Sequence, residues 1–163
     1  MKSISSSSAQ RLSWQTKSDS GSYPPGDGLV CVPDSACSMP TRSYHVLLIE
    51  DEDSVRLLLR EHLELRGYAC HEASHGAEAL RMLQSLTPDA IVCDITMPVM
   101  GGIEFLVKSR AMGCTAPILL LTGVDDSSVR TLGRDAGAYH CISKPPDFDE
   151  LDRLLRLSIA MQS

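Results

Sequence analysis

The sequence lacks any apolar run near the length that a membrane span requires. A transmembrane helix takes about 20 predominantly apolar residues, and no stretch of the 163 residues approaches that length. The first residues also lack the apolar segment of a secretory signal, because Ile4 stands alone among polar residues. We therefore expect a cytoplasmic protein that makes no membrane contact.

Clustered basic charge and metal-type cysteine spacing are missing as well. Lys and Arg number 15 against 21 Asp and Glu, a formal net charge of −6, and the basic residues are scattered. A surface that neutralises nucleic-acid phosphates needs a basic patch, so we expect no direct contact with nucleic acid. The six cysteines form neither a CxxC pair nor the cysteine and histidine spacing of a zinc site. Free thiols in a reducing compartment explain them.

The first quarter of the chain differs in composition from the rest. Residues 1–43 are rich in Ser, Gly and Pro and show no sustained apolar period. Such a segment buries too little apolar surface to offset the entropy cost of ordering. We predict a disordered tail over residues 1–43 and one folded domain over residues 44–163, which is an ordinary domain size.

From residue 44 onward, short apolar segments alternate with amphipathic helical segments. This alternation is typical of βα units built on a parallel sheet. The third and fourth apolar segments are continuous, as expected for central strands that are buried on both faces. The predicted strands are His45–Ile49, Tyr68–Glu72, Ala90–Cys93, Pro117–Leu121 and Ala138–Ile142. The predicted helices cover residues 53–66, 76–85, 101–111, 125–135 and 147–161. The fold class that follows is α/β, a doubly wound five-stranded parallel sheet.

Acidic residues stand where two of the predicted strands end. Glu50, Asp51 and two further acids follow the first strand, and Asp94 follows the third. Ligands of an open parallel sheet bind beyond the carboxyl ends of its strands, so these carboxylates are expected at one edge. Like charges this close favour a neutralising cation, and Mg²⁺ prefers carboxylates, a carbonyl and water. Taken alone, such an acidic run is more often a solvated helix start.

Two further strand ends add a hydroxyl and an ammonium. Thr122 follows the fourth strand and Lys144 follows the fifth. A carboxylate nucleophile, a metal ion, a hydroxyl donor and a lysine form the set of groups that phosphoryl transfer to an aspartate needs.

The motifs that hold these residues closely resemble those of the response-regulator receiver family. The resemblance covers about residues 44–161, and its most specific part matches the pattern D-x-x-M-P-x-M-x-G. Four motifs occur in the family's order: Val46 to Glu52 (VLLIEDE), Asp94 to Gly102 (DITMPVMGG), Leu121 to Gly123 (LTG) and Ser143 to Pro145 (SKP). The resemblance implies a flavodoxin-like (βα)5 fold with strand order 2-1-3-4-5.

The resemblance also implies a role for each acidic residue. It makes Asp94 the phosphate acceptor and a ligand of Mg²⁺. It makes Asp51 a direct ligand and Glu50 a ligand that acts largely through water. It assigns the backbone carbonyl of Thr96 to the same ion.

The remaining roles concern the phosphoryl group itself. By the same resemblance, Thr122 turns its hydroxyl toward the phosphoryl group, and Lys144 pairs first with Asp94 and then with phosphate. The family pattern further implies a cis peptide bond before Pro145, although trans is the usual state of such a bond.

Two positions depart from the family pattern. Glu50 stands where Asp is common, so we expect Mg²⁺ binding with an altered affinity. Cys141 stands where the family usually has Tyr or Phe, and a cysteine cannot make the inward rotation of an aromatic ring. The signal would then pass through Thr122, the following loop and the helix at 125–135, or Tyr139 or His140 would contribute.

The function that we expect is that of a single-domain response regulator. A histidine kinase or a histidine phosphotransfer protein would donate the phosphoryl group, and contact with a downstream protein would carry the signal, because no length remains for an output domain. We expect no enzyme activity beyond self-phosphorylation and slow autodephosphorylation. One alternative is an interaction module that works without phosphorylation. Another is an aspartyl-phosphate hydrolase, but Thr96 stands where its second acid would be.

Overall fold

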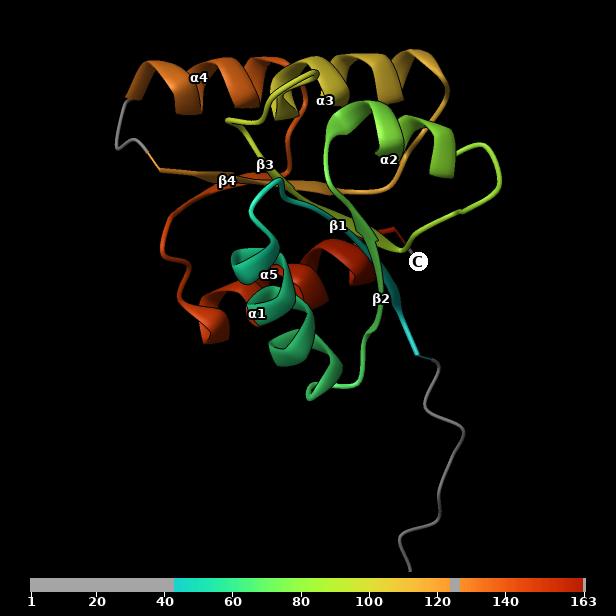
Figure 1. Cartoon of the computed structure of the whole chain (residues 1–163), viewed down its shortest axis with the longest axis vertical. Coiled ribbons are helices and arrows are strands. Elements are labelled where there is room, and N and C mark those ends of the chain that lie inside the picture. The colour runs from blue at the N-terminus through green and yellow to red at the C-terminus, as the bar shows by residue number, and fades with distance from the viewer. Residues whose placement is uncertain (1–42, 124–126, 163) are drawn as a thin grey trace, which may run out of the picture. The chain divides into compact units, whose positions relative to one another are not determined.

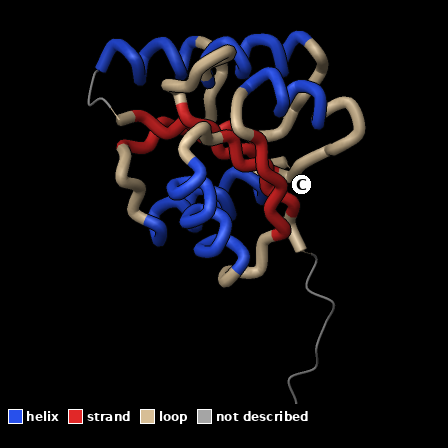
Figure 2. The backbone as a smooth tube through the Cα atoms, viewed as in Figure 1, coloured by secondary structure: helices blue, strands red, loops and turns tan. Residues whose placement is uncertain are grey.

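In the computed structural model, which describes residues 43–123 and 127–162, a parallel sheet lies between two layers of helices (Figure 1). Strands and helices alternate along the chain (Figure 2), which confirms the α/β class. The tail predicted for residues 1–43 lies outside the described residues apart from residue 43. The first two residues of the helix predicted at 125–135 also lie outside them.

The sheet has the strand order β2-β1-β3-β4-β5, and every neighbouring pair is parallel. Its strands are β1 (His45–Ile49), β2 (Ala69–Ala73), β3 (Ala90–Asp94), β4 (Ile118–Thr122) and β5 (His140–Ser143). The order confirms the flavodoxin-like topology. Because β1 is flanked by β2 on one side and β3 on the other, the order reverses there, and open parallel sheets usually bind their ligands beyond the carboxyl ends of the strands at such a point.

Five helices connect or follow the strands: α1 (Asp53–Glu64), α2 (Gly76–Met82), α3 (Gly102–Ala111), α4 (Ser127–Asp135) and α5 (Phe148–Ala160). Helix α5 begins where the side chain of Asp147 accepts hydrogen bonds from the amides of Asp149 and Glu150. Helix α2 is shorter than predicted, because the amide of Ser85 donates to the carbonyl of Met82 in a tighter turn. None of the described helices is long and apolar enough to cross a membrane.

Three strands begin later than the sequence pattern predicts: β2, β5 and β4, which starts at Ile118 rather than Pro117. Helix α1 closes at Gly67, which has φ +90°, and the amide of Tyr68 donates to the carbonyl of Leu63. This closing turn uses the backbone of Tyr68, so β2 starts one residue later, at Ala69. Gly137 closes α4 in the same way, and β5 starts at residue 140 rather than residue 138.

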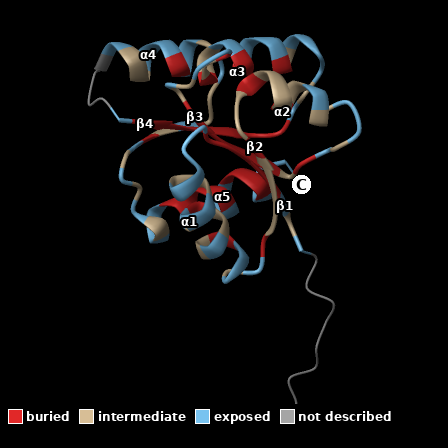
Figure 3. Cartoon of the chain, viewed as in Figure 1, coloured by how far each residue is buried: buried red, intermediate tan, exposed pale blue. Residues whose placement is uncertain are grey.

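An apolar cluster on each face holds the sheet between its helices. On one face, α1 and α5 contribute Leu59 and Leu155 to the cluster that contains Leu48. On the other face, Phe105 of α3 belongs to the cluster that contains Leu47. Figure 3 shows the central strands as buried. Successive residues of β1 therefore pack against opposite layers, as predicted for a central parallel strand, and the packing fixes where each strand ends.

Candidate functional site

Three carboxylates meet at the carboxyl ends of β1 and β3. The strands are adjacent and in register, with Ile49 opposite Cys93, so the residues that follow them are neighbours. One oxygen from each of Glu50, Asp51 and Asp94 lies within 4.8 Å of the others. In the described part of the chain, no other group of three acidic, histidine or cysteine side chains meets in this way. We call these three residues the acidic cluster.

Lys144 at the end of β5 reaches into the acidic cluster. Its Nζ atom lies 2.6 Å from Oε2 of Glu50 and 2.9 Å from Oδ2 of Asp94. The backbone amide of Lys144 donates to the carbonyl of Thr122 at 2.7 Å, and the peptide bond to Pro145 is cis, as the family pattern implied. Fixed strand ends thus bring together residues that stand far apart in the sequence.

Burial and charge act on the ionisation of these groups. Burial raises the pKa of Glu50 and the charge of Asp94 raises it further, while the hydrogen bond from Lys144 opposes both. Burial alone would lower the pKa of Lys144, but its hydrogen bonds to Asp94 and Glu50 outweigh burial and leave that pKa raised. Lys144 is therefore a fixed positive charge at neutral pH.

The acidic cluster fits a hard divalent cation. Three carboxylates and one ammonium leave two negative charges uncompensated. Asp51 is exposed, whereas Glu50 and Asp94 are 1% and 5% exposed, so an ion that enters would keep water on one side. This combination of carboxylates and retained water suits Mg²⁺.

Thr96 and Thr122 lie at the same edge of the sheet. The amide of Thr96 donates to Oδ1 of Asp94 at 3.2 Å, which places the loop after β3 beside the carboxylate of Asp94. Thr122 is the last residue of β4 and is buried. The carbonyl of Thr96 as a metal ligand and the hydroxyl of Thr122 as a phosphoryl contact stay predictions.

The loop after Asp94 requires glycine at two successive positions. A Cβ atom on Gly102 would lie 2.3 Å from the carbonyl oxygen of Asp94, and one on Gly101 would lie 2.9 Å from that of Ile95. Both neighbours are backbone atoms, which cannot rotate away. The two successive glycines in the sequence indicate a tight loop, but they do not indicate which carbonyl oxygens the loop backbone approaches.

Cys141 lies beneath α4, at the strand position where the family usually has an aromatic residue. Its Sγ atom would be 2.9 Å from a Cβ atom added to Gly133, so α4 passes closely over β5 at this point. Arg130 of α4 crosses the same strand and donates from Nη2 to Oγ of Ser143 at 2.5 Å. No local sequence pattern indicated this link between α4 and the residue that precedes Lys144.

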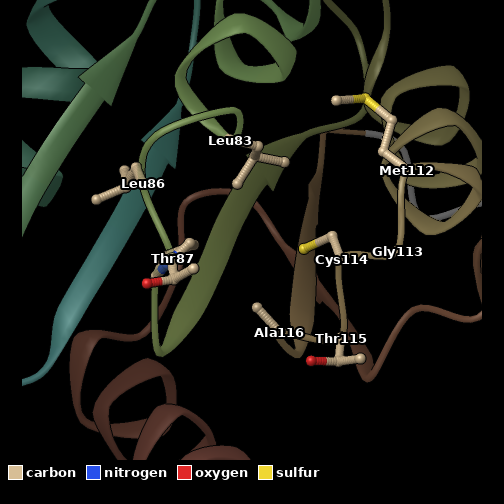
Figure 4. Close-up of a pocket in the computed structure, with 9 residues that line it drawn as sticks. Leu83, Leu86, Thr87, Met112, Gly113, Cys114, Thr115 and Ala116 are labelled. Carbon is tan, nitrogen blue, oxygen red and sulfur yellow. The ribbon is translucent and has the colours of Figure 1, made fainter.

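A separate hollow lies at the opposite edge of the sheet. It has a volume of about 180 Å³ and is formed by the connections that lead into β3 and β4 (Figure 4). Its described lining holds no charged side chain; the residues are Leu83, Leu86, Thr87, Pro88, Met112, Gly113, Cys114, Thr115 and Ala116. The groups that acid–base or phosphoryl chemistry needs are therefore at the acidic cluster and not here.

The sequence model of the response regulator receiver domain matches residues 46–156, a span that contains the acidic cluster and Lys144. The chain belongs to this family. Response regulator MprA of Mycobacterium ulcerans (strain Agy99) is 41% identical to this receiver domain over 109 residues, which are 67% of the chain and 47% of that protein. Regulatory protein AtoC of Escherichia coli (strain K12) is 32% identical over 123 residues, 76% of the chain and 27% of that protein. The chain thus spans about half the length of MprA and a smaller share of AtoC.

Solved receiver structures resemble this one over nearly their whole length. The Francisella response regulator 1452 receiver domain superimposes with a TM-score of 0.71 at 25% identity, covering 74% of this chain and 100% of its own. The chemotaxis protein CheY4 of Vibrio cholerae gives a TM-score of 0.68 at 31% identity, covering 71% of this chain and 98% of its own. These likenesses confirm the fold class and the receiver family.

Proposed function

We propose that this receiver domain accepts a phosphoryl group on Asp94 from a phosphohistidine of a histidine kinase or a histidine phosphotransfer protein, and that the reaction depends on Mg²⁺. The observation that carries the proposal is the contact of Lys144 Nζ with Oδ2 of Asp94 at 2.9 Å inside the acidic cluster. A carboxylate nucleophile beside a fixed cation is arranged to receive a group that brings negative charge.

The transfer step forms one bond and breaks one. A carboxylate oxygen of Asp94 attacks phosphorus, and the bond between phosphorus and the imidazole nitrogen of the donor breaks. The imidazole leaves with the electron pair and is neutral when its other nitrogen carries a proton. In the product, Lys144 moves its hydrogen bond from Asp94 to a phosphoryl oxygen, and the hydroxyl of Thr122 donates to another.

The acidic cluster supplies the metal site in this proposal. Asp51, Asp94 and the carbonyl of Thr96 would hold Mg²⁺, with Glu50 acting through water. When bound, Mg²⁺ neutralises charge on the phosphoryl oxygens. Lys144 draws the carboxylates of Glu50 and Asp94 together, because it is hydrogen-bonded to both.

We further propose that the output is contact with a downstream protein and that the domain acts in the cytoplasm. The net charge of −6 argues against direct nucleic-acid contact. Chemistry would be limited to self-phosphorylation and slow dephosphorylation, since Thr96 stands where a hydrolase would need a second acid.

The test is incubation of the full chain with acetyl phosphate and Mg²⁺, followed by intact-mass measurement. The expected result is one added phosphoryl group that hydroxylamine removes, lost in Asp94→Asn and kept in Asp53→Asn, a control at the exposed first residue of α1. Chelation of Mg²⁺ should abolish the modification. A chain that is never phosphorylated by acetyl phosphate or by any histidine kinase supplied would instead be a phosphorylation-independent interaction module.

A further inference from the structure

Two histidines face each other across the first two strands, remote from the acidic cluster. Nδ1 of His45 on β1 lies 2.9 Å from Nε2 of His71 on β2. The ring centroids are 5.2 Å apart and the ring planes are inclined by 21°, so the rings lie end to end and the two nitrogens point at each other. In the strand register His71 is opposite Leu47, so the two histidines are diagonal neighbours on one face of the sheet.

The separation of the two nitrogens suits a metal ion as well as a shared proton. Metal–imidazole bonds are about 2.0–2.1 Å long, so two ligands at roughly 90° stand about 2.9 Å apart, whereas tetrahedral ligands stand about 3.3 Å apart. The 2.9 Å between His45 Nδ1 and His71 Nε2 matches the first value. This spacing is that of adjacent ligands in square-planar or octahedral geometry, which Cu²⁺ and Ni²⁺ favour.

The backbone holds His45 in place from the opposite side. The amide of His45 donates to Oδ2 of Asp89 at 2.8 Å, and the amide of Asp89 donates to the carbonyl of His45 at 2.8 Å. The carboxylate of Asp89 therefore adds negative charge next to the pair while it is occupied with the backbone. A bound ion would take two ligands from the protein and the rest from water.

We propose that His45 and His71 form a site for a divalent transition-metal ion of the copper or nickel class. In the metal-free pair, one ring N–H donates to the lone pair of the other ring. On binding, that proton moves to the outer nitrogen of its ring, so both imidazoles stay neutral, and the two rings turn about their side-chain bonds until both lone pairs converge on the ion. Mg²⁺ does not compete, because it prefers the oxygen ligands of the acidic cluster.

The position of the site gives it a structural consequence. Strand β2 is an edge strand, and the ion would join it to β1 through side chains in addition to the backbone ladder. His45 stands five residues before Glu50 on an extended strand, about 16 Å away. Because binding occurs only in the folded chain, the ion should raise the unfolding temperature without occupying the phosphorylation site.

The experiment is a titration of the ¹⁵N-labelled full chain with Cu²⁺ and with Ni²⁺, in excess Mg²⁺ to fill the acidic cluster. Paramagnetic broadening should be centred on the amides near His45, His71 and Asp89. Calorimetric titration should give tighter binding for Cu²⁺ than for Ni²⁺. His71→Ala and His45→Ala should each lower the affinity for the ion by roughly 10-fold to 100-fold or more. Loss of a residue that only hydrogen-bonds a metal ligand already lowers affinity by that factor.

His140→Ala is the matched control, because it removes an exposed strand histidine far along the sheet, on β5. It should leave the titration unchanged. The amide spectrum of each variant reports whether the fold is kept. The proposal is overturned if the two pair variants bind as the wild type does, if broadening is centred on the acidic cluster or on cysteines, or if binding is too weak to measure.

Discussion

Lys144 is closer to Glu50 than to Asp94, at 2.6 Å against 2.9 Å from Nζ to the nearest carboxylate oxygens. The residue that departs from the common aspartate of the family therefore makes the shorter ion pair. Its longer side chain carries the carboxylate to the ammonium, and Lys144 is shared between the two acids. An incoming divalent cation has to compete with this ammonium for both carboxylates.

Lys144→Met should separate metal binding from phosphoryl transfer. Removal of the ammonium leaves three carboxylates without an internal cation, so Mg²⁺ affinity should rise, while phosphorylation by acetyl phosphate should slow because one phosphoryl contact is lost. Lys144→Arg keeps the charge and should bind Mg²⁺ much as the wild type does. Calorimetry and intact-mass kinetics measure the two effects. Weaker Mg²⁺ binding in Lys144→Met would show that the lysine does not compete with the ion.

Gly102→Ala should damage the loop that carries the acceptor. The new Cβ atom would lie 2.3 Å from the carbonyl oxygen of Asp94, and relief requires a backbone shift that costs about 1–3 kcal/mol or more. Urea unfolding should show that loss, and phosphorylation should slow because Asp94 moves. Gly123→Ala is the control, since its added Cβ atom meets nothing within 4 Å. Equal stability of the two variants would refute the close approach.

Cys141→Tyr should not restore the usual aromatic switch. Its ring would have to enter the space where Sγ already lies beneath Gly133 and α4, so we expect a loss of about 1–3 kcal/mol from overpacking. Cys141→Ala should cost less and should still be phosphorylated, because the thiol makes no contact with Asp94 in the described structure. Thermal unfolding and intact mass measure both. If Cys141→Tyr is as stable as the wild type, α4 moves to make room for the ring and the prediction is wrong.

Acid should weaken the link between α5 and the residue that precedes β2. Burial alone would raise the pKa of Asp152, but its hydrogen bonds from Arg156 and Tyr68 outweigh burial and leave that pKa below 3.8. The ionised form is thus favoured by folding, and its contribution is present above about pH 4 and is lost as pH falls through the lowered pKa.

Asp152→Asn should therefore cost roughly 1–2 kcal/mol at about pH 7, and the difference from wild type should narrow with acidification. Urea unfolding over a pH series measures it. Glu61→Gln, an exposed change on α1, should have little effect at any pH. A gap between Asp152→Asn and wild type that stays constant down to low pH would contradict the proposed ionisation.

The sequence was sufficient for the fold and for most of the site. The acidic cluster and Lys144 stand at strand ends. The carboxyl ends of parallel strands share one edge of the sheet regardless of the loop conformations. The continuous apolar runs of β3 and β4 indicated buried central strands. Positions of the strand starts were less well predicted, because the closing turn at Gly67 uses backbone that the apolar pattern assigns to the strand.

Contacts between distant elements could not be predicted in the same way. No local pattern pairs Arg130 with Ser143, because helix and strand meet only through the packing of α4 on the sheet. The same holds for His45 and His71, whose approach depends on the β1–β2 register. A register shift of one residue would place the two rings on opposite faces.

The central claim is that Asp94 carries the phosphoryl group, and reduction of the acyl phosphate tests it at the residue level. After phosphorylation with acetyl phosphate and Mg²⁺, borohydride converts a phosphorylated aspartate to homoserine, which peptide mass spectrometry locates. The account predicts homoserine at residue 94 and at no other acidic position. Homoserine at Asp51 or another aspartate, or 5-hydroxynorvaline at Glu50 or another glutamate, in place of homoserine at residue 94 would contradict it.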